Sequence, residues 1–426
     1  MKNLNVLTTL FVGIDISSKN NVVYAMDFHS NKLLNVSVKN NHVGALELTD
    51  HICSIMEDST FTSIVFAMES TSNYAIHLAT YLSSDSKLLA FNPYVYCLNA
   101  KTISNYRKSF VGLPKTDNQD AYIIADFARV GRIQSDPWRG SQFLALQRLT
   151  RHRLHLVDAV VREKNYMVAN VFLKFSELSV LKDDEHPFTS NYTATAEAVL
   201  TEFFSVQEII DLSIEELVEF LCKKSKNRFS NPNEVASILK KAARDSYRLD
   251  DTLYEPLNAA IASSFNCIAT FQKEIKDIDK AIIRAIKGLN TNEYQCLLSI
   301  PGIGPVFAAG ILSEIGSVKS FNSHDALAKY AGIVWNKNQS GDFDSDVTSM
   351  SKAGNRYLRY YLIEATNSVK NHMPEYNAFF KKKYDEVKTH QYKRALALTS
   401  RKFIRLIYGL LAKDQLYSPS KVGETK

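Results

Sequence analysis

The sequence predicts an α/β domain with a mixed sheet, followed by all-α regions, and two observations support this fold class. Strand-like apolar runs alternate with helical patterns through residues 8–135, and helical patterns dominate after residue 140. A chain of 426 residues is long enough for two or three domains. We therefore divide it into residues 1–140, 141–290 and 291–426.

The first part shows strand and helix patterns in a definite order. TLFVGIDIS, NNVVYAMDF and KLLNVSV predict three strands in a meander, and VGALELTDHICSIM predicts a helix. SIVFAMES and KLLAFNP predict two further strands, with the helix NYAIHLATYLSS between them. A meander followed by helix-separated strands forms a mixed sheet covered by helices. This is the order expected of a ribonuclease-H-like domain.

Two long helices are predicted in the middle of the chain, at residues 141–175 and 253–286. The second carries a heptad seam with 3-4-3-4-3 spacing, formed by Ile268, Phe271, Ile275, Ile278, Ile282 and Ala285. Three arrangements fit this pattern. The helix packs on its own domain, pairs with the first helix as an antiparallel arm, or joins a second chain in a coiled coil.

Residues 176–250 are more polar and are predicted to form a small helical insertion. Ser213 and Glu216 have the spacing of a capping box before the run LVEFL. Asn231, followed by Pro232, places a cap and a first-turn proline before NEVASILKKAA. Both signals predict helix starts within the insertion.

A last helical domain is predicted at residues 294–412, opening with LLSIPGIGPVFAAGILSEIG. Gly302 and Gly304 form a Gly-x-Gly turn between apolar helical segments, which fits a helix-hairpin-helix. The exposed amides of such a turn hold a DNA phosphate without reading bases. An ordinary tight turn between helices is the alternative.

The polar segment WNKNQSGDFDSDVTSMSKAGNRYLR follows in the same domain. By its local pattern alone, Ser340 is a turn residue, because Ser-Gly is common in polar loops. Ser351 is predicted to cap a helix that carries Arg356 and Arg359. These arginines are three residues apart and are placed to clamp a phosphate.

Basic residues gather in two regions of a chain whose net charge is +6. Residues 352–413 hold 14 Lys or Arg against 4 Asp or Glu, and residues 101–164 hold 12 against 6. This distribution indicates binding to a polyanion, with a solvated helix face as the alternative for each region. The larger excess includes Arg356, Arg359, Lys381, Lys382, Lys383, Lys393, Arg394, Arg401, Lys402 and Arg405. The candidate nucleic-acid contacts are Lys115, Arg148, Arg151, Arg153, Gly302, Gly304, Lys352, Asn355, Arg356 and Arg359.

Cysteine usage and hydropathy predict the cellular compartment of the protein. The five cysteines are scattered without paired spacing, which indicates a reducing cytoplasm and argues against a zinc site. No apolar run approaches the ~20 residues needed to span a bilayer. The apolar N-terminal segment leads directly into Asp15 and is interpreted as a strand rather than a signal peptide.

Four carboxylates form the strongest chemical signal. Asp15 ends the run FVGID and Glu69 ends IVFAME, so both are predicted at strand ends. Asp117 and Asp120 are three residues apart at the start of a helical pattern, which places them on one helix face. Magnesium prefers such oxygen ligands, and two ions can activate a nucleophile and stabilise a leaving oxygen during phosphodiester cleavage. Each acid alone is more commonly a surface residue.

These motifs together resemble the DEDD transposases of bacterial insertion sequences, which are bridge-RNA-guided recombinases related to the Piv DNA invertase. GIDISS, AMESTSNY, Asn92-Pro93 and KTDNQDA resemble the RuvC-like domain of that family. SIPGIG, YAGIVWNKNQSG and SKAGNRYLR resemble its C-terminal transposase domain. The resemblance covers nearly the whole chain; the polar block at residues 176–250 is longer than in compact members.

The resemblance implies a site and a set of partners. Asp15, Glu69, Asp117 and Asp120 match the metal-binding tetrad, which implies Mg²⁺ or Mn²⁺, and Ser340 matches a serine nucleophile that forms a phosphoserine link to DNA. Donor and target DNA, a noncoding bridge RNA and a dimer-to-tetramer assembly follow from the family. Its active sites combine two subunits, and the heptad segment would then be the dimerising coiled coil. A nucleoid-associated location in a bacterial cytoplasm follows as well.

Two other functions fit parts of the sequence. A Holliday-junction-type nuclease would use the tetrad with water as nucleophile and would need no serine. A nucleic-acid-binding protein with a degenerate tetrad is disfavoured, because all four acids are present. Covalently linked DNA, free nicked DNA and uncut DNA distinguish the three hypotheses.

Overall fold

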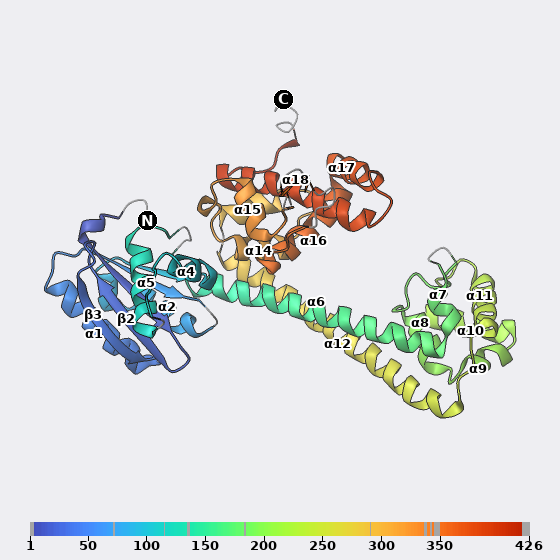
Figure 1. Ribbon diagram of the computed structural model, residues 1–426. Coiled ribbons are helices and arrows are strands. Elements are labelled where there is room, and N and C mark those ends of the chain that lie inside the picture. The colour runs from blue at the N-terminus through green and yellow to red at the C-terminus, as the bar shows by residue number, and fades with distance from the viewer. Residues whose placement is uncertain are drawn as a thin grey trace. The chain divides into compact units, whose positions relative to one another are not determined.

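The protein is described from a computed structural model, shown in Figure 1. The described residues are 4–70, 73–114, 116–133, 137–182, 185–289, 291–335, 339–340, 343–344 and 350–419. They group into two compact units. One consists of Met1–Arg148 with Ala285–Lys426, and the other of Leu149–Arg284.

A five-stranded mixed sheet forms the centre of the N-terminal domain, in the order β3-β2-β1-β4-β5. The first three strands form the predicted antiparallel meander, whereas β1, β4 and β5 are parallel. The strands are β1 (Thr9–Ile16), β2 (Asn20–Met26), β3 (Lys32–Lys39), β4 (Ser63–Glu69) and β5 (Pro93–Leu98). A single 3₁₀ turn, Val6–Thr8, precedes β1. The prediction of a mixed α/β sheet is confirmed.

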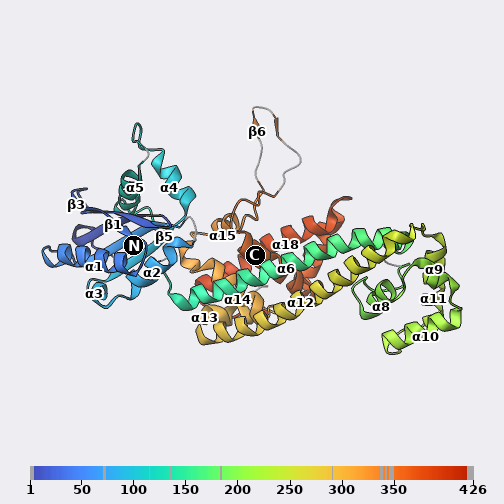
Figure 2. The same cartoon turned by 90° about the horizontal axis from the view of Figure 1, so that it is seen from below.

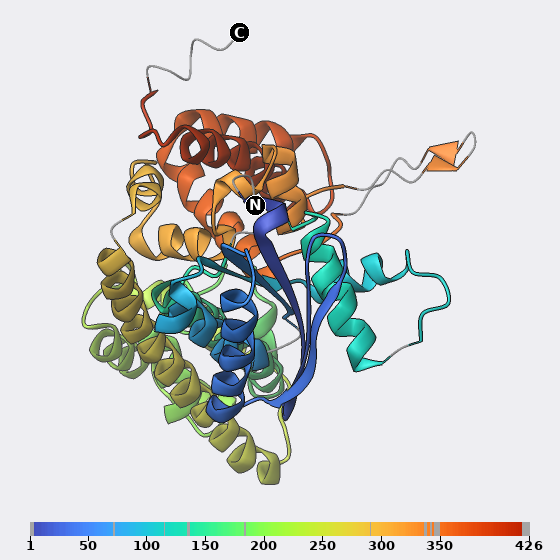
Figure 3. The ribbon, with the colours of Figure 1, turned by 90° about the vertical axis from the view of Figure 1, so that its left-hand side faces the viewer.

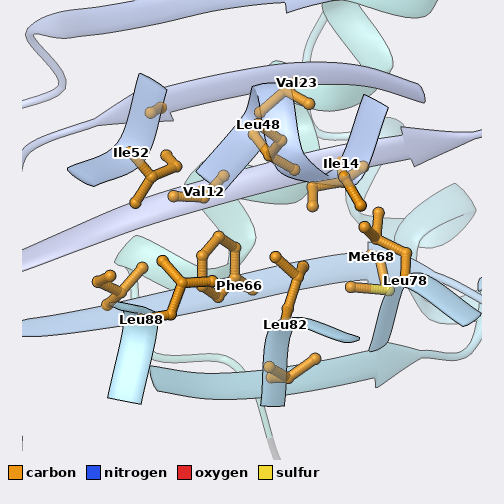
Figure 4. Close-up of a cluster of buried hydrophobic side chains, with 14 of the residues drawn as sticks. Val12, Ile14, Val23, Leu48, Ile52, Phe66, Met68, Leu78, Leu82 and Leu88 are labelled. Carbon is orange, nitrogen blue, oxygen red and sulfur yellow. The ribbon is translucent and has the colours of Figure 1, made fainter. Parts of the chain in front are cut away.

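Helices cover both faces of this sheet because its central strands are buried on both sides. The helices α1 (His42–Glu57), α2 (Tyr74–Ser84) and α3 (Ser86–Leu89) share one apolar core with β1, β2 and β4, as Figure 4 shows. On the other face, α4 (Ala100–Arg107) and α5 (Asp117–Arg129) form a second core. In Figure 3, α1 in blue and α5 in teal lie on opposite sides of the strands.

The predicted strand KLLAFNP is wrong. Its first residues belong to α3, because the side chain of Asp85 accepts hydrogen bonds from the amides of Lys87 (3.0 Å) and Leu88 (3.1 Å) and so starts a helical turn. The strand begins only at Pro93, where the β-rich run YVYCL follows.

The second unit is built on two long helices, α6 (Ser141–Lys174) and α12 (Asp251–Leu289), which lie side by side in Figures 1 and 2. Ser264 Oγ donates to Glu163 Oε1 over 2.6 Å, and Arg153 Nε donates to Asp279 Oδ1 over 2.5 Å. The earlier residue of α6 pairs with the later residue of α12, so the two helices are antiparallel. Of the three predicted arrangements, the antiparallel arm is the one formed within the chain.

Five short helices within the described residues connect the two long ones. They surround an apolar core that also takes in the adjoining ends of α6 and α12. The capping box at Ser213 and Glu216 is present, and Asn231 caps the helix that starts at Pro232. The predicted helical insertion is therefore confirmed. Its helices are α7 (Ser176–Val180), α8 (Ala194–Glu202), α9 (Val206–Asp211), α10 (Ile214–Ser225) and α11 (Pro232–Asp245).

The C-terminal domain is predominantly helical, as predicted. A two-stranded ladder of β6 (Gln339–Ser340) and β7 (Phe343–Asp344) and a 3₁₀ turn at Val318–Ser320 are its other regular elements among the described residues. The helices are α13 (Asn292–Leu298), α14 (Pro305–Ile315), α15 (His324–Ala331), α16 (Arg356–His372), α17 (Pro374–Asp385) and α18 (Gln391–Lys413). The described residues contain no helix long and apolar enough to cross a membrane.

Candidate active site

Asp15 and Glu69 lie at the same edge of the sheet. The parallel strands β1 and β4 are in register, with Ile14 opposite Met68, so the residue after each is an acid at the carboxyl end of its strand. Carboxyl ends of neighbouring parallel strands are where α/β sheets place ligands. Glu69 is thus at the sheet edge that its position in the sequence predicts.

Both acids also belong to the face that α5 covers. Side chains alternate between the faces of a strand. Phe11 in β1, and Val65 with Ala67 in β4, belong to the core that contains α5. Asp15 and Glu69 continue these alternating series, which places both acids on the α5 face.

The first turn of α5 carries the other two acids of the predicted tetrad. Thr116 is the N-cap, and its hydroxyl accepts a hydrogen bond from the amide of Gln119 over 3.4 Å. Asp117 and Asp120 follow within that turn, where the helix dipole stabilises negative charge. Gly13 in β1 allows α5 to pack directly on the strand, because an added Cβ atom would stand 2.3 Å from the amide nitrogen of Ala125.

The side chains themselves are not gathered around one point. Asp120 forms an ion pair with Arg107 of α4, a partner that the sequence reasoning did not identify. Within the described residues, no group of three or more His, Cys, Asp or Glu side chains is arranged to hold a metal ion. Carboxylates are the donors that magnesium prefers, so the residue types fit such a site, but Asp120 is paired with Arg107.

Ser340 is the last residue of β6 and pairs with Phe343 of β7. Residues 341–342 between them, and the predicted loop residues 345–349, lie outside the described part of the chain. The side chain of Ser340 also lies outside the described part of the structure.

The Gly-x-Gly segment joins α13 to α14. Gly302 has φ +93°, and an added Cβ atom would lie 3.0 Å from Val369 Cα, so glycine is required for both backbone and space. Gly304 is the N-cap of α14 and offers no side chain, while Pro305 supplies the first helical residue. The first amides of α14 therefore have no side-chain cap, as a phosphate-binding turn requires.

The predicted N-cap of the arginine-bearing helix is wrong. Helix α16 starts at Arg356, and Asn355 caps it by accepting hydrogen bonds from the amides of Tyr357 and Leu358, each over 3.0 Å. Ser351 lies too early in the chain to reach these amides. Its hydroxyl accepts instead from the amide of Ala353 over 3.4 Å.

Arg359 forms hydrogen bonds with the backbone of its own domain. Its Nη1 donates to the carbonyl oxygens of Ala331 (3.1 Å) and Lys352 (2.9 Å). Burial, and then the positive charge of Arg356, lowers the pKa of the Arg359 guanidinium below its ordinary value. A guanidinium stays charged despite such a shift. Part of the hydrogen-bonding capacity of Arg359 is thus used within its own domain, whereas Arg356 is the first residue of the helix.

The candidate basic contacts in and before α6 differ in their surroundings. Arg148 is exposed and donates to the side-chain oxygen of Asn73 at the start of α2. Arg153 forms the ion pair with Asp279 described above, which already neutralises its charge. Arg151 is half-buried, and Lys115 lies outside the described residues.

Several residues of the C-terminal basic region are paired with acids. Lys383 and Arg394 both contact Glu386, and Lys402 lies 3.8 Å from Glu375. Arg401 pairs with Asp325. Lys381, Lys382, Lys393 and Arg405 are exposed. Lys352, Arg356, Lys388 and Lys413 of the same region are exposed as well, so the charge accessible to a polyanion is spread over these eight residues.

Comparison with known proteins matches two segments of the chain. A family model described as a transposase matches residues 12–174, and the model of the transposase IS116/IS110/IS902 family matches residues 294–381. The chain belongs to the IS116/IS110/IS902 family of transposases. It is accordingly a DNA transposase, and the two matched segments contain the sheet domain and the Gly-x-Gly turn.

Relatives of similar length support the same assignment. The chain is 24% identical to an uncharacterized 42 kDa protein of insertion element IS900 from Mycobacterium paratuberculosis, over 96% of this chain and 98% of the relative. It is 21% identical to a 44.8 kDa protein of insertion element IS116 from Streptomyces clavuligerus, over 96% of both chains. It is also 24% identical to the transposase of insertion sequence IS1111A from Coxiella burnetii, over 48% of this chain and 60% of the relative.

Proposed function

We propose that this transposase is a site-specific recombinase that moves its own insertion sequence through a serine nucleophile, Ser340. The observations that support the proposal most are that Asp15 and Glu69 lie at one sheet edge and that Gly13, two residues before Asp15, packs against Ala121, the residue after Asp120. We extend the proposal to the three-part division at residues 1–140, 141–290 and 291–426, with a RuvC-like catalytic domain first and a serine-bearing domain last.

The four acids would hold Mg²⁺ or Mn²⁺ at the sheet edge. Bound there, the metal would supply Lewis-acid stabilisation of charge on the scissile phosphate. Arg107 must release Asp120 for all four acids to act together. Until then its guanidinium relieves repulsion between neighbouring carboxylates.

The covalent step proposed for Ser340 balances as follows. The Oγ atom loses its proton and attacks the phosphorus, so that an Oγ–P bond forms while a P–O bond to a deoxyribose hydroxyl breaks. The departing oxygen takes up a proton. Rejoining reverses these changes with a different DNA hydroxyl, and no external energy source is required because one ester replaces another.

Donor and target DNA, a noncoding bridge RNA and a second copy of the chain are the proposed partners. The Gly-x-Gly turn and the exposed lysines suit phosphate contact. The arm offers a surface for a second copy: Val161, Val168 and Phe172 of α6 follow heptad spacing and are 51%, 46% and 48% exposed. Replacing Val168 and Phe172 by Glu should lower the mass measured by light scattering.

The test is denaturing electrophoresis of labelled DNA incubated with full-length protein, bridge RNA and magnesium. DNA linked to Ser340, located by mass spectrometry of the linked peptide, supports the proposal. Ser340→Ala should form no adduct and no recombinant product, yet keep DNA binding. Free nicked DNA would indicate the nuclease that uses water, and DNA left uncut under all conditions would indicate a binding protein.

A further inference from the structure

A cavity of about 510 Å³ opens in the N-terminal domain between the beginnings of α1 and α2. Ser18, two residues beyond the end of β1, lies at its margin. Both helices belong to the sheet face opposite α5, so the cavity is separate from the face that carries the four acids. Its size is within the ~300–1,000 Å³ of typical small-ligand sites.

Aromatic rings form one wall. Tyr74, His77, Leu78 and Tyr81 line the cavity from a single face of α2, as their three- and four-residue spacing requires. From α1, the ring of His42 meets Tyr81 edge-on, with centroids 5.7 Å apart. A flat group entering between these helices finds ring faces and edges to pack against.

Neutral amides form the opposite rim, where Asn40, Asn41 and Asn73 line the cavity. Asn40 is fixed in place, because its Nδ2 donates to the carbonyl oxygens of Ser17 (2.8 Å) and Tyr74 (3.5 Å). Behind it, the buried Asn21 donates to Asn40 Oδ1 over 3.3 Å. Asn41 Oδ1 and Asn73 Oδ1 each accept one hydrogen bond, from the amide of Gly44 and from Arg148. An amide oxygen has a second lone pair and an amide nitrogen two donors, so these two side chains can still match the edge of a nucleobase.

The chemistry of the lining selects the ligand class. Among the ten described lining residues, none is Lys, Arg, Asp or Glu. A free phosphate or a metal ion would find no countercharge of that kind, whereas a flat, uncharged and hydrogen-bonding heterocycle matches the rings and amides. Proteins hold unstacked bases in the same way, by aromatic stacking combined with contacts to the base edge.

The position of the cavity suggests where such a base comes from. Ser18 follows the strand that ends with the Asp15 segment, and α2 begins five residues after Glu69. We propose that this cavity binds one unpaired nucleobase of the nucleic-acid strand that passes the cleavage site. The inference rests on the proposed recombinase function, and the strand is DNA or RNA.

Binding of fluorescently labelled oligonucleotides to full-length protein tests this inference. The probes are a fully paired duplex and the same duplex with one extrahelical base, each made as DNA and as RNA. Titrations are run without divalent metal, so that no strand is cut and the outcome is independent of Ser340. An extrahelical base should tighten binding by about tenfold in at least one of the two nucleic acids, and that nucleic acid identifies the source.

Substitutions locate the effect. In the doubly substituted protein Tyr74→Ala with His77→Ala, the preference for the extrahelical base should vanish while duplex affinity stays within about twofold. Replacing the same two residues by Phe keeps the rings and should keep the preference. Tyr166→Ala, which removes an exposed tyrosine (61%) from α6, is the matched control. No preference in the wild-type chain for either nucleic acid, or a preference that survives the double alanine change, overturns the proposal.

Discussion

A Cβ atom on Gly13 would stand 2.2 Å from the carbonyl oxygen of Ala121, the residue directly after Asp120. Backbone therefore packs against backbone where α5 crosses β1. Because Gly13 is two residues before Asp15, this contact fixes how far the first turn of α5 lies from the strand end. The missing side chain is what allows the backbone of α5 next to Asp120 to approach the strand that carries Asp15.

Gly13→Ala should separate α5 from the sheet. Overpacked core positions typically cost ~1–3 kcal/mol, and contacts this short place the change at or above the upper end. We expect a lower melting temperature and loss of DNA cleavage. Gly288→Ala in α12 is the control, because nothing lies within 4 Å of the added atom there and alanine favours the helix. Equal melting temperatures for wild type and Gly13→Ala would contradict the close packing.

Asp15→Asn and Glu69→Gln should abolish strand cleavage without unfolding the protein, because carboxylates at an empty metal site mainly repel one another. In thermal melts, magnesium should raise the melting temperature of the wild type and not of these variants. Arg107→Met frees Asp120 from its ion pair and should enlarge the magnesium-dependent rise. If Asp15→Asn cut DNA at the wild-type rate, the metal assignment would fail.

The corrected cap of α16 gives a direct comparison of two polar residues. Asn355→Ala removes the acceptor for two helix amides and should cost about 1–2 kcal/mol of unfolding free energy. It also removes the hydrogen bond from Nδ2 to Glu314 Oε2 (2.8 Å), which leaves a buried carboxylate with one partner fewer. Ser351→Ala should change stability by less than about 0.5 kcal/mol. Chemical denaturation followed by circular dichroism compares the two.

DNA affinity should fall steeply with salt. Each phosphate contact on duplex DNA contributes roughly −0.9 to the slope of log affinity against log salt. Replacing the exposed Lys381, Lys382 and Lys393 by Gln should flatten the slope by about 0.9 for each residue that contacts a phosphate. Lys280→Gln, which removes an exposed lysine paired with Asp277, should leave it unchanged. An unaltered slope in the triple variant would place the DNA surface elsewhere.

Local patterns were sufficient where the structure depends on neighbours in the sequence. The nearly continuous burial along β1 and β4 follows from their apolar runs, and the capping signals at Ser213 and Asn231 act within one helical turn. The helix at Lys87 could also have been predicted from the local sequence, because Asp85 is a helix-capping residue and two leucines come shortly after it.

Contacts between distant segments could not be predicted in this way. Nothing in the sequence around Asp120 indicates that Arg107 of the preceding helix pairs with it, and nothing around Gly13 indicates Ala121. The same holds for the cavity between α1 and α2, whose residues come from three separate stretches of chain. Such sites form when helices and strands that are distant in the sequence pack together. The local patterns of a single sequence predict the helices and strands but not how they pack.

Lys174 provides a test of the helical insertion. Its side chain is buried, with 2% exposed, and Nζ donates to the carbonyl oxygens of Leu200 (2.8 Å) and Phe203 (2.5 Å) and to Asn258 Oδ1 (2.5 Å). Two of these acceptors belong to the C-terminal turn of α8 and its cap, where a positive charge is favourable. Burial nevertheless lowers the pKa of Lys174 to about 8, against the partly compensating charge of Glu208.

The protein should therefore become more stable as the pH rises from about 8 to about 10.5, the ordinary pKa of lysine. In this window the unfolded chain binds a proton that the folded chain has released, so the unfolding free energy increases with pH. Lys174→Met should abolish this contribution and cost about 1–3 kcal/mol at neutral pH, because it leaves buried carbonyls without a donor. Lys241→Met, at an exposed position of α11, should retain the wild-type profile. Denaturation midpoints measured at intervals from pH 7 to pH 10 decide the matter: parallel profiles for wild type and Lys174→Met would show that Lys174 does not titrate in this range.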